Sequence, residues 1–226
     1  MSLDALLQSN RLWRAGEHSA QVPALPTGYR DLDVLLPGGG WPDSGLVELL
    51  PARSGIGELG LLMPALARLS RGSRWIAWVA PPYLPYAPAL TAAGIDLSRV
   101  LMVYPRDSQD GFWALEQALR AGTCAAVLAW PQTLDARAMR RLQLASEAGN
   151  SVGFLFRENT ARRQPSTVQL RLQLDCPANP QHSEIDMQRL SVDILKRRGG
   201  WPVGPVTVAV QSAAKTETEG LQVSVA

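Results

Sequence analysis

Lysine, cysteine and histidine are scarce in this chain of 226 residues, and each shortage excludes a kind of site. The two lysines are Lys196 and Lys215, so no lysine can serve a phosphate-binding loop in the first 195 residues. The two cysteines, Cys124 and Cys176, lie far apart and show no metal-ligand spacing. Cys124 sits in an apolar stretch and is expected to be a small core residue. The two histidines are isolated, so the sequence predicts no metal site.

Strong charge and long apolar runs are also missing. The net charge is +2, which is too weak to argue for nucleic-acid binding. A hydrophobic content of 46% with 19% charged residues is enough to bury a core, so a disordered protein is excluded. No signal-peptide pattern and no long apolar span occur in the sequence. We therefore expect a cytoplasmic protein without membrane contact.

Short apolar runs alternate with amphipathic segments through the middle of the chain. This alternation predicts parallel strands joined by helices in right-handed crossovers, which is an α/β fold with a mostly parallel sheet. The expected strands are 46–50, 74–80, 100–103, 125–129 and 152–156, and the expected helices are 58–69, 85–93, 108–121 (capped by the Ser108 hydroxyl) and 133–148. Three later strand-like runs, 167–175, 188–196 and 203–211, would extend the sheet with antiparallel strands.

The chain divides into an N-terminal helical arm with its linker (1–25), a core (26–211) and a polar tail (212–226) expected to be flexible. The arm contains a predicted helix from Ser2 to Arg14 that can be capped by Ser2. An apolar stripe on this helix docks either on a partner, including a second copy of the chain, or on the protein's own core, and both alternatives stay open. The stripe residues are Leu3, Leu6, Leu7 and Trp13.

The segment 45–69 has the strand, glycine turn and helix layout of a phosphate-binding loop, but its chemistry differs. Gly55 and Gly57 are present, whereas Pro51 removes a backbone donor and Glu58 stands where a lysine would be needed. A unit-charge contact at 4 Å is worth about 4 kcal/mol at an effective dielectric near 20, so a carboxylate in place of lysine opposes phosphate binding. An acid also suits the first turn of a helix for electrostatic reasons. We interpret the loop as degenerate and predict no cofactor and no enzymatic activity.

Several segments resemble known families. PTGYRDLDVLLPGGGWPDSGLVEL (26–49) is similar to the approach to the phosphate loop in RecA-type recombinases. ARSGIGELGLLMPALARLS, WVAPPYLPYAPAL, AAVLAWPQTLDARAMRRLQLA and ILKRRGGW resemble the ImuA family of SOS mutagenesis proteins, which is itself SulA-like. The resemblance implies a RecA-like α/β core with a degenerate phosphate loop.

Residues matching the recombinase ATPase positions do not carry that chemistry. Ala80, Pro81 and Pro82 stand where the family has a catalytic glutamate, and Ala129 and Trp130 stand where an aspartate would hold Mg²⁺. Arg157 and Glu158 match the region of the polar sensor. A residual ATPase is therefore the least favoured of the functions that the resemblance implies.

The ImuA resemblance implies an accessory protein of damage-induced translesion DNA synthesis. Its expected partners are an ImuB-type inactive Y-family polymerase homologue, an error-prone C-family polymerase and RecA. The alternative is a SulA-like cell division inhibitor that binds FtsZ. An interface position of the recombinases is matched by Lys196, Arg197 and Arg198. Weak candidates for DNA contact are Arg162 and Arg163. The simpler interpretation of both groups is that they are solvated charges at the end of a strand and in a turn.

Overall fold

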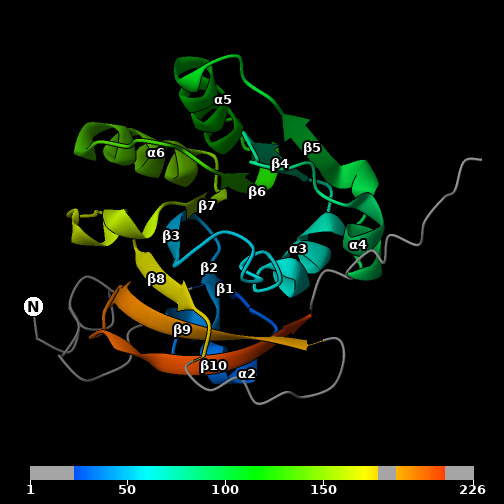
Figure 1. Cartoon of the computed structure of the whole chain (residues 1–226). Coiled ribbons are helices and arrows are strands. Elements are labelled where there is room, and N and C mark those ends of the chain that lie inside the picture. Colours follow the sequence, from blue (N-terminus) through cyan, green and yellow to red (C-terminus); the bar gives the residue numbers. More distant parts are fainter. Residues whose placement is uncertain (1–22, 178–186, 212–226) are drawn as a thin grey trace, which may run out of the picture.

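The computed structural model describes residues 23–177 and 187–211, and its architecture is mixed α/β (Figure 1). The arm stripe and the predicted tail lie outside the described residues. The strands are β1 (Ala24–Leu25), β2 (Trp41–Pro42), β3 (Gly45–Pro51), β4 (Trp75–Val79), β5 (Val100–Val103), β6 (Cys124–Ala129), β7 (Val152–Phe156), β8 (Leu170–Asp175), β9 (Met187–Arg197) and β10 (Val203–Gln211). The α-helices are α2 (Arg30–Asp33), α3 (Met63–Ser70), α4 (Ala87–Ala92), α5 (Ser108–Arg120) and α6 (Ala136–Ala148). Short 3-10 turns form η1 (Pro37–Gly39), η2 (Leu97–Arg99) and η3 (Asn159–Arg163).

Eight strands form one sheet in the order β10-β9-β8-β3-β7-β6-β4-β5. The six strands from β8 to β5 are parallel, and β9 and β10 add antiparallel pairs beyond β8. The mostly parallel sheet predicted from the sequence is thus confirmed. The expectation that the run 167–175 joins the sheet as an antiparallel strand is wrong for its pairing with β3, which is parallel. The chain crosses back through η3 after β7, so β8 runs parallel to β3 in the register Val47 to Leu170.

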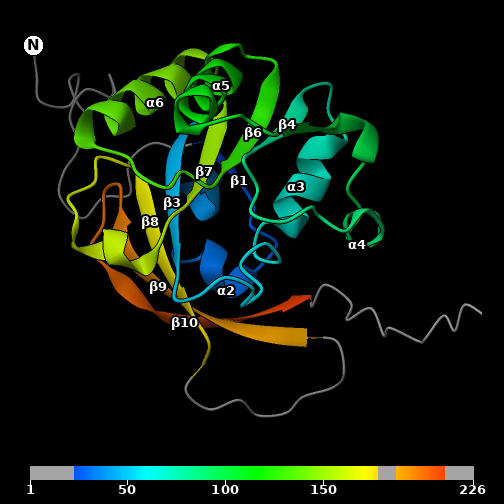
Figure 2. The same ribbon diagram turned by 45° about the horizontal axis from the view of Figure 1, so that its top comes forward.

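Helices cover both faces of the parallel strands (Figure 2). Helices α5 and α6 pack over one face around Leu119, Val127 and Leu142, while α3 and α4 cover the other around Leu66 and Trp78. Helix α2 packs against β10. Strands buried on both faces must be apolar at nearly every position, which explains why short continuous runs predicted them. Cys124 lies in the first of these cores, as expected, and burial raises the pKa of its thiol.

Helix starts differ most from the sequence-based expectations. The helix predicted from residue 58 begins at Met63, after turns, because Pro64 lacks an N–H and fits only the first turn of a helix. Asp107, rather than Ser108, caps α5 by accepting the Asp110 N–H at 2.8 Å. Asp135 caps α6 in the same way, so that helix begins three residues later than expected. No helix in residues 23–177 or 187–211 combines the length and apolarity needed to span a membrane.

A buried ion cluster joins the centre of the sheet to its C-terminal extension. The Glu48 side chain, on β3, is fully buried and pairs with Arg157 (Nη1 to Oε1, 2.6 Å) and Arg171 (Nε to Oε2, 3.0 Å). Arg157 follows β7 and also donates to Gln164 Oε1 at 2.8 Å. Arg171, on β8, donates to the carbonyls of Ala161 and Gln164. One carboxylate therefore holds three strands and the loop around η3 together.

The first prediction concerns this cluster. Glu48→Gln should lower the free energy of unfolding by about 3–5 kcal/mol, because it leaves two buried guanidinium groups without a counter-charge. Denaturant unfolding followed by circular dichroism measures the change.

Glu116→Gln is the matched control, since Glu116 also bridges two arginines, Arg120 and Arg141. Those arginine side chains are about half exposed (53% and 52%), so water can solvate them when the carboxylate is lost. The control should cost about 1 kcal/mol or less. Equal losses in the two variants would contradict the assignment of Glu48 as the central charge.

Candidate functional site

The loop that follows β3 satisfies its own backbone. Gly55 and Gly57 adopt positive φ values of 81° and 89°, which a tight turn at these positions requires. The Glu58 carboxylate folds back and accepts the Gly55 N–H at 3.0 Å. Its other oxygen, Oε2, is buried with no hydrogen-bond partner among the described residues. A side-chain carboxylate thus occupies an amide that a phosphate-binding loop would offer to its ligand.

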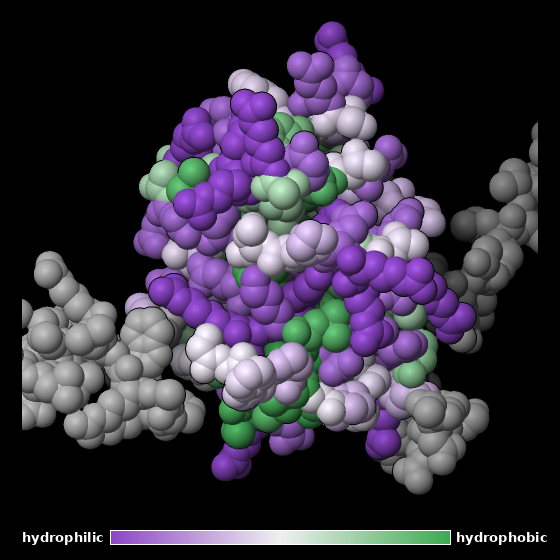
Figure 3. Space-filling view, turned by 90° about the vertical axis from the view of Figure 1, so that its left-hand side faces the viewer, coloured by the Kyte–Doolittle hydropathy of each residue, from purple (hydrophilic) through white to green (hydrophobic). Residues whose placement is uncertain are grey.

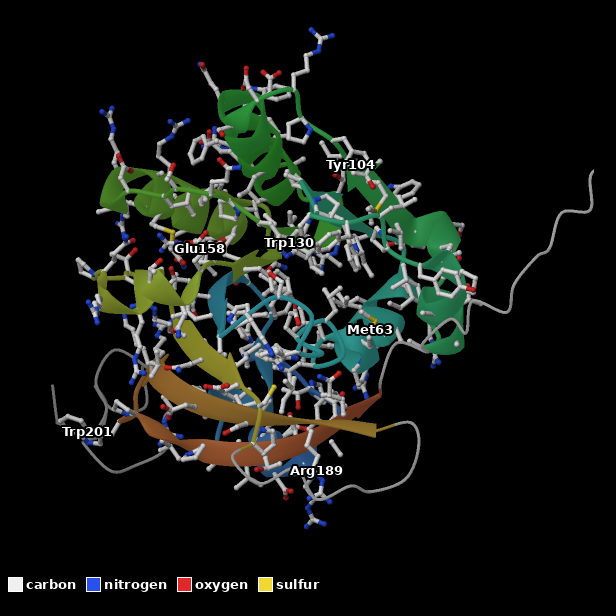
Figure 4. All side chains as sticks on the ribbon, in the orientation of Figure 1. Met63, Tyr104, Trp130, Glu158, Arg189 and Trp201 are labelled. Carbon is white, nitrogen blue, oxygen red and sulfur yellow. The ribbon has the colours of Figure 1, made fainter. Side chains whose placement is uncertain are left out.

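Aromatic rings fill the carboxyl end of the central strands. Trp130, which follows β6, stacks on Phe156 with ring centroids 4.6 Å apart and an interplanar angle of 6°. It also packs against Trp78 at 5.8 Å (Trp130 is labelled in Figure 4). No group of three or more potential metal ligands occurs within the described part of the chain. The position matched to a Mg²⁺-binding aspartate is therefore part of an apolar stack.

Two shallow clefts provide little for a small ligand. One of about 400 Å³ lies between the loop after β6 and η3, beside Asp135, Arg157 and Glu158. The Arg157 guanidinium on its wall is already held by Glu48 and Gln164. The other cleft, of about 480 Å³, lies between α2 and β10. Arg157 thus has a structural role. Its buried partner Glu48 is not predicted from the sequence, because Glu48 lies inside the apolar run GLVELL.

The predicted interface cations lie at the turn between β9 and β10. Lys196 Nζ donates to the Ser166 carbonyl at 2.7 Å, which holds this turn against the loop after η3. Arg197 donates to the carbonyls of Trp201 and Leu35, whereas Arg198 is exposed just beyond β9. Figure 3 views the molecule from the side of this turn and shows mostly hydrophilic residues.

The other predicted positions have mixed outcomes. Arg162 and Arg163, at the end of η3, are exposed, and a DNA contact there stays a prediction. The arm residues Leu3, Leu6, Leu7 and Trp13 lie outside the described residues, so their docking role also stays a prediction.

Large apolar side chains are exposed on the loop between β4 and α4. This PPYLPY loop (residues 81–86) exposes Tyr83, Leu84 and Tyr86, with exposed fractions of 76%, 80% and 54%. It contains three prolines, Pro81, Pro82 and Pro85, and each fixes the backbone φ at its position. The sequence reasoning passed over this loop because it sought charged and nucleotide-binding residues. The proline spacing around aromatic residues was the signal that could have identified it.

The PPYLPY loop lies next to the end of strand β5. Ala80, directly before the loop, donates its N–H to the Val103 carbonyl at 2.9 Å. Tyr104 follows β5 and is 57% exposed (Figure 4). The exposed apolar residues of the loop and of β5 therefore meet at the carboxyl ends of two neighbouring parallel strands.

Comparison with known proteins identifies the stretch that contains these residues. The family model described as "Cell division inhibitor SulA" matches residues 52–153. The chain is 35% identical over 116 residues to the cell division inhibitor SulA of Edwardsiella piscicida, a match that spans 51% of this chain and 69% of that protein. It is 31% identical over 85 residues to SulA of Photorhabdus laumondii subsp. laumondii, spanning 38% of this chain and 48% of that protein. The crystal structure of SulA from Pseudomonas aeruginosa aligns with a TM-score of 0.43 and 28% identity, covering 50% of this chain and 97% of that one.

These matches correct the main functional prediction. The relatives are named as cell division inhibitors, so the predicted accessory role in translesion synthesis is wrong. The predicted partners are therefore wrong as well, namely an ImuB-type polymerase homologue, a C-family polymerase and RecA. The alternative that was set beside this prediction agrees with the relatives' names. Those names also agree with a protein that is not an enzyme.

Proposed function

Because this chain belongs to the SulA family of cell division inhibitors, we propose that it blocks division by binding FtsZ through the PPYLPY loop. FtsZ is the partner implied by the SulA-like alternative drawn from the sequence. The action is stoichiometric, since inhibition by docking needs a complementary surface rather than a reaction centre. The observation that carries the proposal is the exposure of this loop within the stretch matched by the family model.

The loop has the physical properties of a protein-binding hot spot. Tyr83 and Tyr86 offer large apolar rings with a hydroxyl that can pair at an interface, and tyrosine is enriched at such positions. Leu84 is 80% exposed, so little of its side chain is buried against the described residues. Contiguous exposed apolar groups on a monomer mark interaction sites. The prolines within the loop restrict its backbone before it binds, which lowers the entropy lost on docking.

The proposal also includes a RecA-like origin of the core with a phosphate loop that has lost its ligand. The strand, turn and helix order of β3, the following loop and α3 supports this origin. The Glu58 contact with Gly55 and the Trp130 stack on Phe156 support the loss of function. The finer resemblance to ImuA rests on segments such as ILKRRGGW (194–201), which lies beyond residues 52–153, and it carries no translesion role.

The docking prediction uses the double variant Tyr83→Ser, Leu84→Ser. A hot-spot residue contributes about 2 kcal/mol or more, so the variant should bind FtsZ at least about 30-fold more weakly. Light scattering of FtsZ assembly with GTP, in the presence of increasing inhibitor, measures the effect. Because both side chains are exposed, the thermal midpoint of the variant should match that of the wild type.

Val34→Ser is the matched control, since Val34 is 77% exposed but lies outside residues 52–153. It should inhibit assembly as the wild type does. If the double variant and the control inhibit FtsZ equally well, the PPYLPY loop is not the docking site.

A third prediction follows from the degenerate loop. Isothermal titration with Mg·ATP should show no binding tighter than about 1 mM, which corresponds to about −4.1 kcal/mol. The physical reason is that Glu58 presents a negative charge and occupies the Gly55 amide. A submillimolar dissociation constant would contradict it.

A further inference from the structure

The turn between β9 and β10 is held against the loop that follows η3. Lys196 Nζ donates to the Ser166 carbonyl at 2.7 Å, which joins two segments 30 residues apart in the chain. Arg162 and Arg163, at the end of η3, precede Ser166 by so few residues that their backbone lies within about 14 Å of it. Cations from two separate segments are therefore gathered on one side of the molecule.

Positive charge dominates these two segments. Residues 158–167 and 196–201 contain five cations and one acid, Glu158. Four of the cations are exposed, namely Arg162, Arg163, Lys196 and Arg198. No carboxylate of residues 23–177 or 187–211 lies within ion-pair distance of any of the four. Their charges are therefore available to an external anion.

Trp201 lies on the same turn. Its side chain is 85% exposed, more than any other large apolar side chain among the described residues, and Figure 4 shows it pointing away from β9 and β10. The turn itself is fixed, because Arg197 Nε donates to the Trp201 carbonyl at 2.9 Å and Arg197 also donates to the Leu35 carbonyl. An uncovered indole ring is thus held in a defined place beside the cations.

A flat aromatic ring next to several cations suits a single strand of nucleic acid. The cations can contact the phosphates, while a base of any sequence can stack on the exposed indole. Bases inside a duplex are already stacked on one another, so the ring favours an unpaired strand. Acidic groups alone, on a peptide or on a lipid surface, would neutralise the cations but offer no base to stack on the indole.

We propose that this cationic patch binds single-stranded nucleic acid without sequence preference. The patch consists of Arg162, Arg163, Lys196, Arg198 and Trp201. It is separate from the proposed FtsZ site, because the PPYLPY loop follows β4, close to the other end of the sheet order (Figure 1). The proposal therefore goes beyond division inhibition and does not rest on it.

The chemistry of the patch sets what it distinguishes. Stacking and phosphate contacts do not read the sugar 2′-hydroxyl, which is the group that separates RNA from DNA. Single strands of DNA and RNA with the same length should bind with dissociation constants within about threefold of each other. Both should bind more tightly than a DNA duplex of that length, because only the single strands offer an unstacked base to the indole.

The first test measures the salt dependence of binding. Fluorescence anisotropy of a labelled oligo-dT of about 12 nucleotides is followed while the full chain is added, at several salt concentrations and without FtsZ. Four phosphate contacts predict a slope of about −2.8 when log affinity is plotted against log salt concentration. The double variant Arg162→Ala, Arg163→Ala should lower the slope to about −1.4, because two contacts are lost.

The second test removes the ring. Trp201→Ala should raise the dissociation constant for the same oligomer by about fivefold or more, because the stacked base loses its partner. Trp201→Phe should keep most of the affinity, since an aromatic ring remains. The altered side chains are exposed, so the variants should keep their fold, which circular dichroism verifies.

Matched controls remove the same groups elsewhere. Trp113→Ala deletes an indole that is 64% exposed on α5, and the double variant Arg68→Ala, Arg71→Ala deletes two exposed arginines at the end of α3. Both should bind the oligomer as the wild type does.

The proposal is overturned if the wild type does not bind the oligomer at low salt, or if the controls weaken binding as much as the patch variants do. Tighter binding to a duplex, to polyglutamate or to phosphatidylglycerol vesicles would overturn it too, because charge alone would then explain the contact. Wild-type affinity in Trp201→Ala would contradict the stacking. None of these outcomes bears on FtsZ binding, since the measurement contains no FtsZ.

Discussion

A single buried carboxylate, that of Glu48, connects the centre of the sheet to strand β8 and the loop around η3. The Glu48 side chain is fully buried at the centre of the sheet, where an ionised group without partners would be strongly unfavourable. Its charge is matched by Arg157 and Arg171, which come from β7 and β8. The arginines in turn bind Gln164 and the Ala161 carbonyl, so the loop around η3 is fixed by the same contacts. Strands β8 to β10, beyond the stretch matched by the SulA family model, are thereby continuous with the core.

The sequence predicts the strands well because the rule behind them is local. A strand buried on both faces must be apolar throughout, and the bounds of VGFLF at 152–156 are predicted correctly for this reason. The bounds of the edge strand VLMV at 100–103 are also predicted correctly, from its continuous apolar run. Features set by distant partners were not predicted. Glu48 lies 109 residues before Arg157, and no local pattern links them. The direction of β8 also depends on the path of the connection through η3, and the residues of the strand itself do not determine that path.

The candidate docking site was missed for a related reason. The exposure of a residue depends on which other residues cover it, so the same residue type occurs both exposed and buried. Trp75 and Trp78 lie in one apolar run, yet Trp75 is 40% exposed while Trp78 is 1% exposed in the core. Trp78 gains its cover from Trp130, a contact across two strands. The functional error had another origin, because shared motifs across a superfamily identify a fold more securely than they identify a partner.

The contact between Glu58 and Gly55 also bears on how a ligand could enter the loop after β3. A loop whose amide is satisfied by its own side chain is ordered without a nucleotide. A nucleotide entering this loop would first have to displace the Glu58 carboxylate from the Gly55 amide.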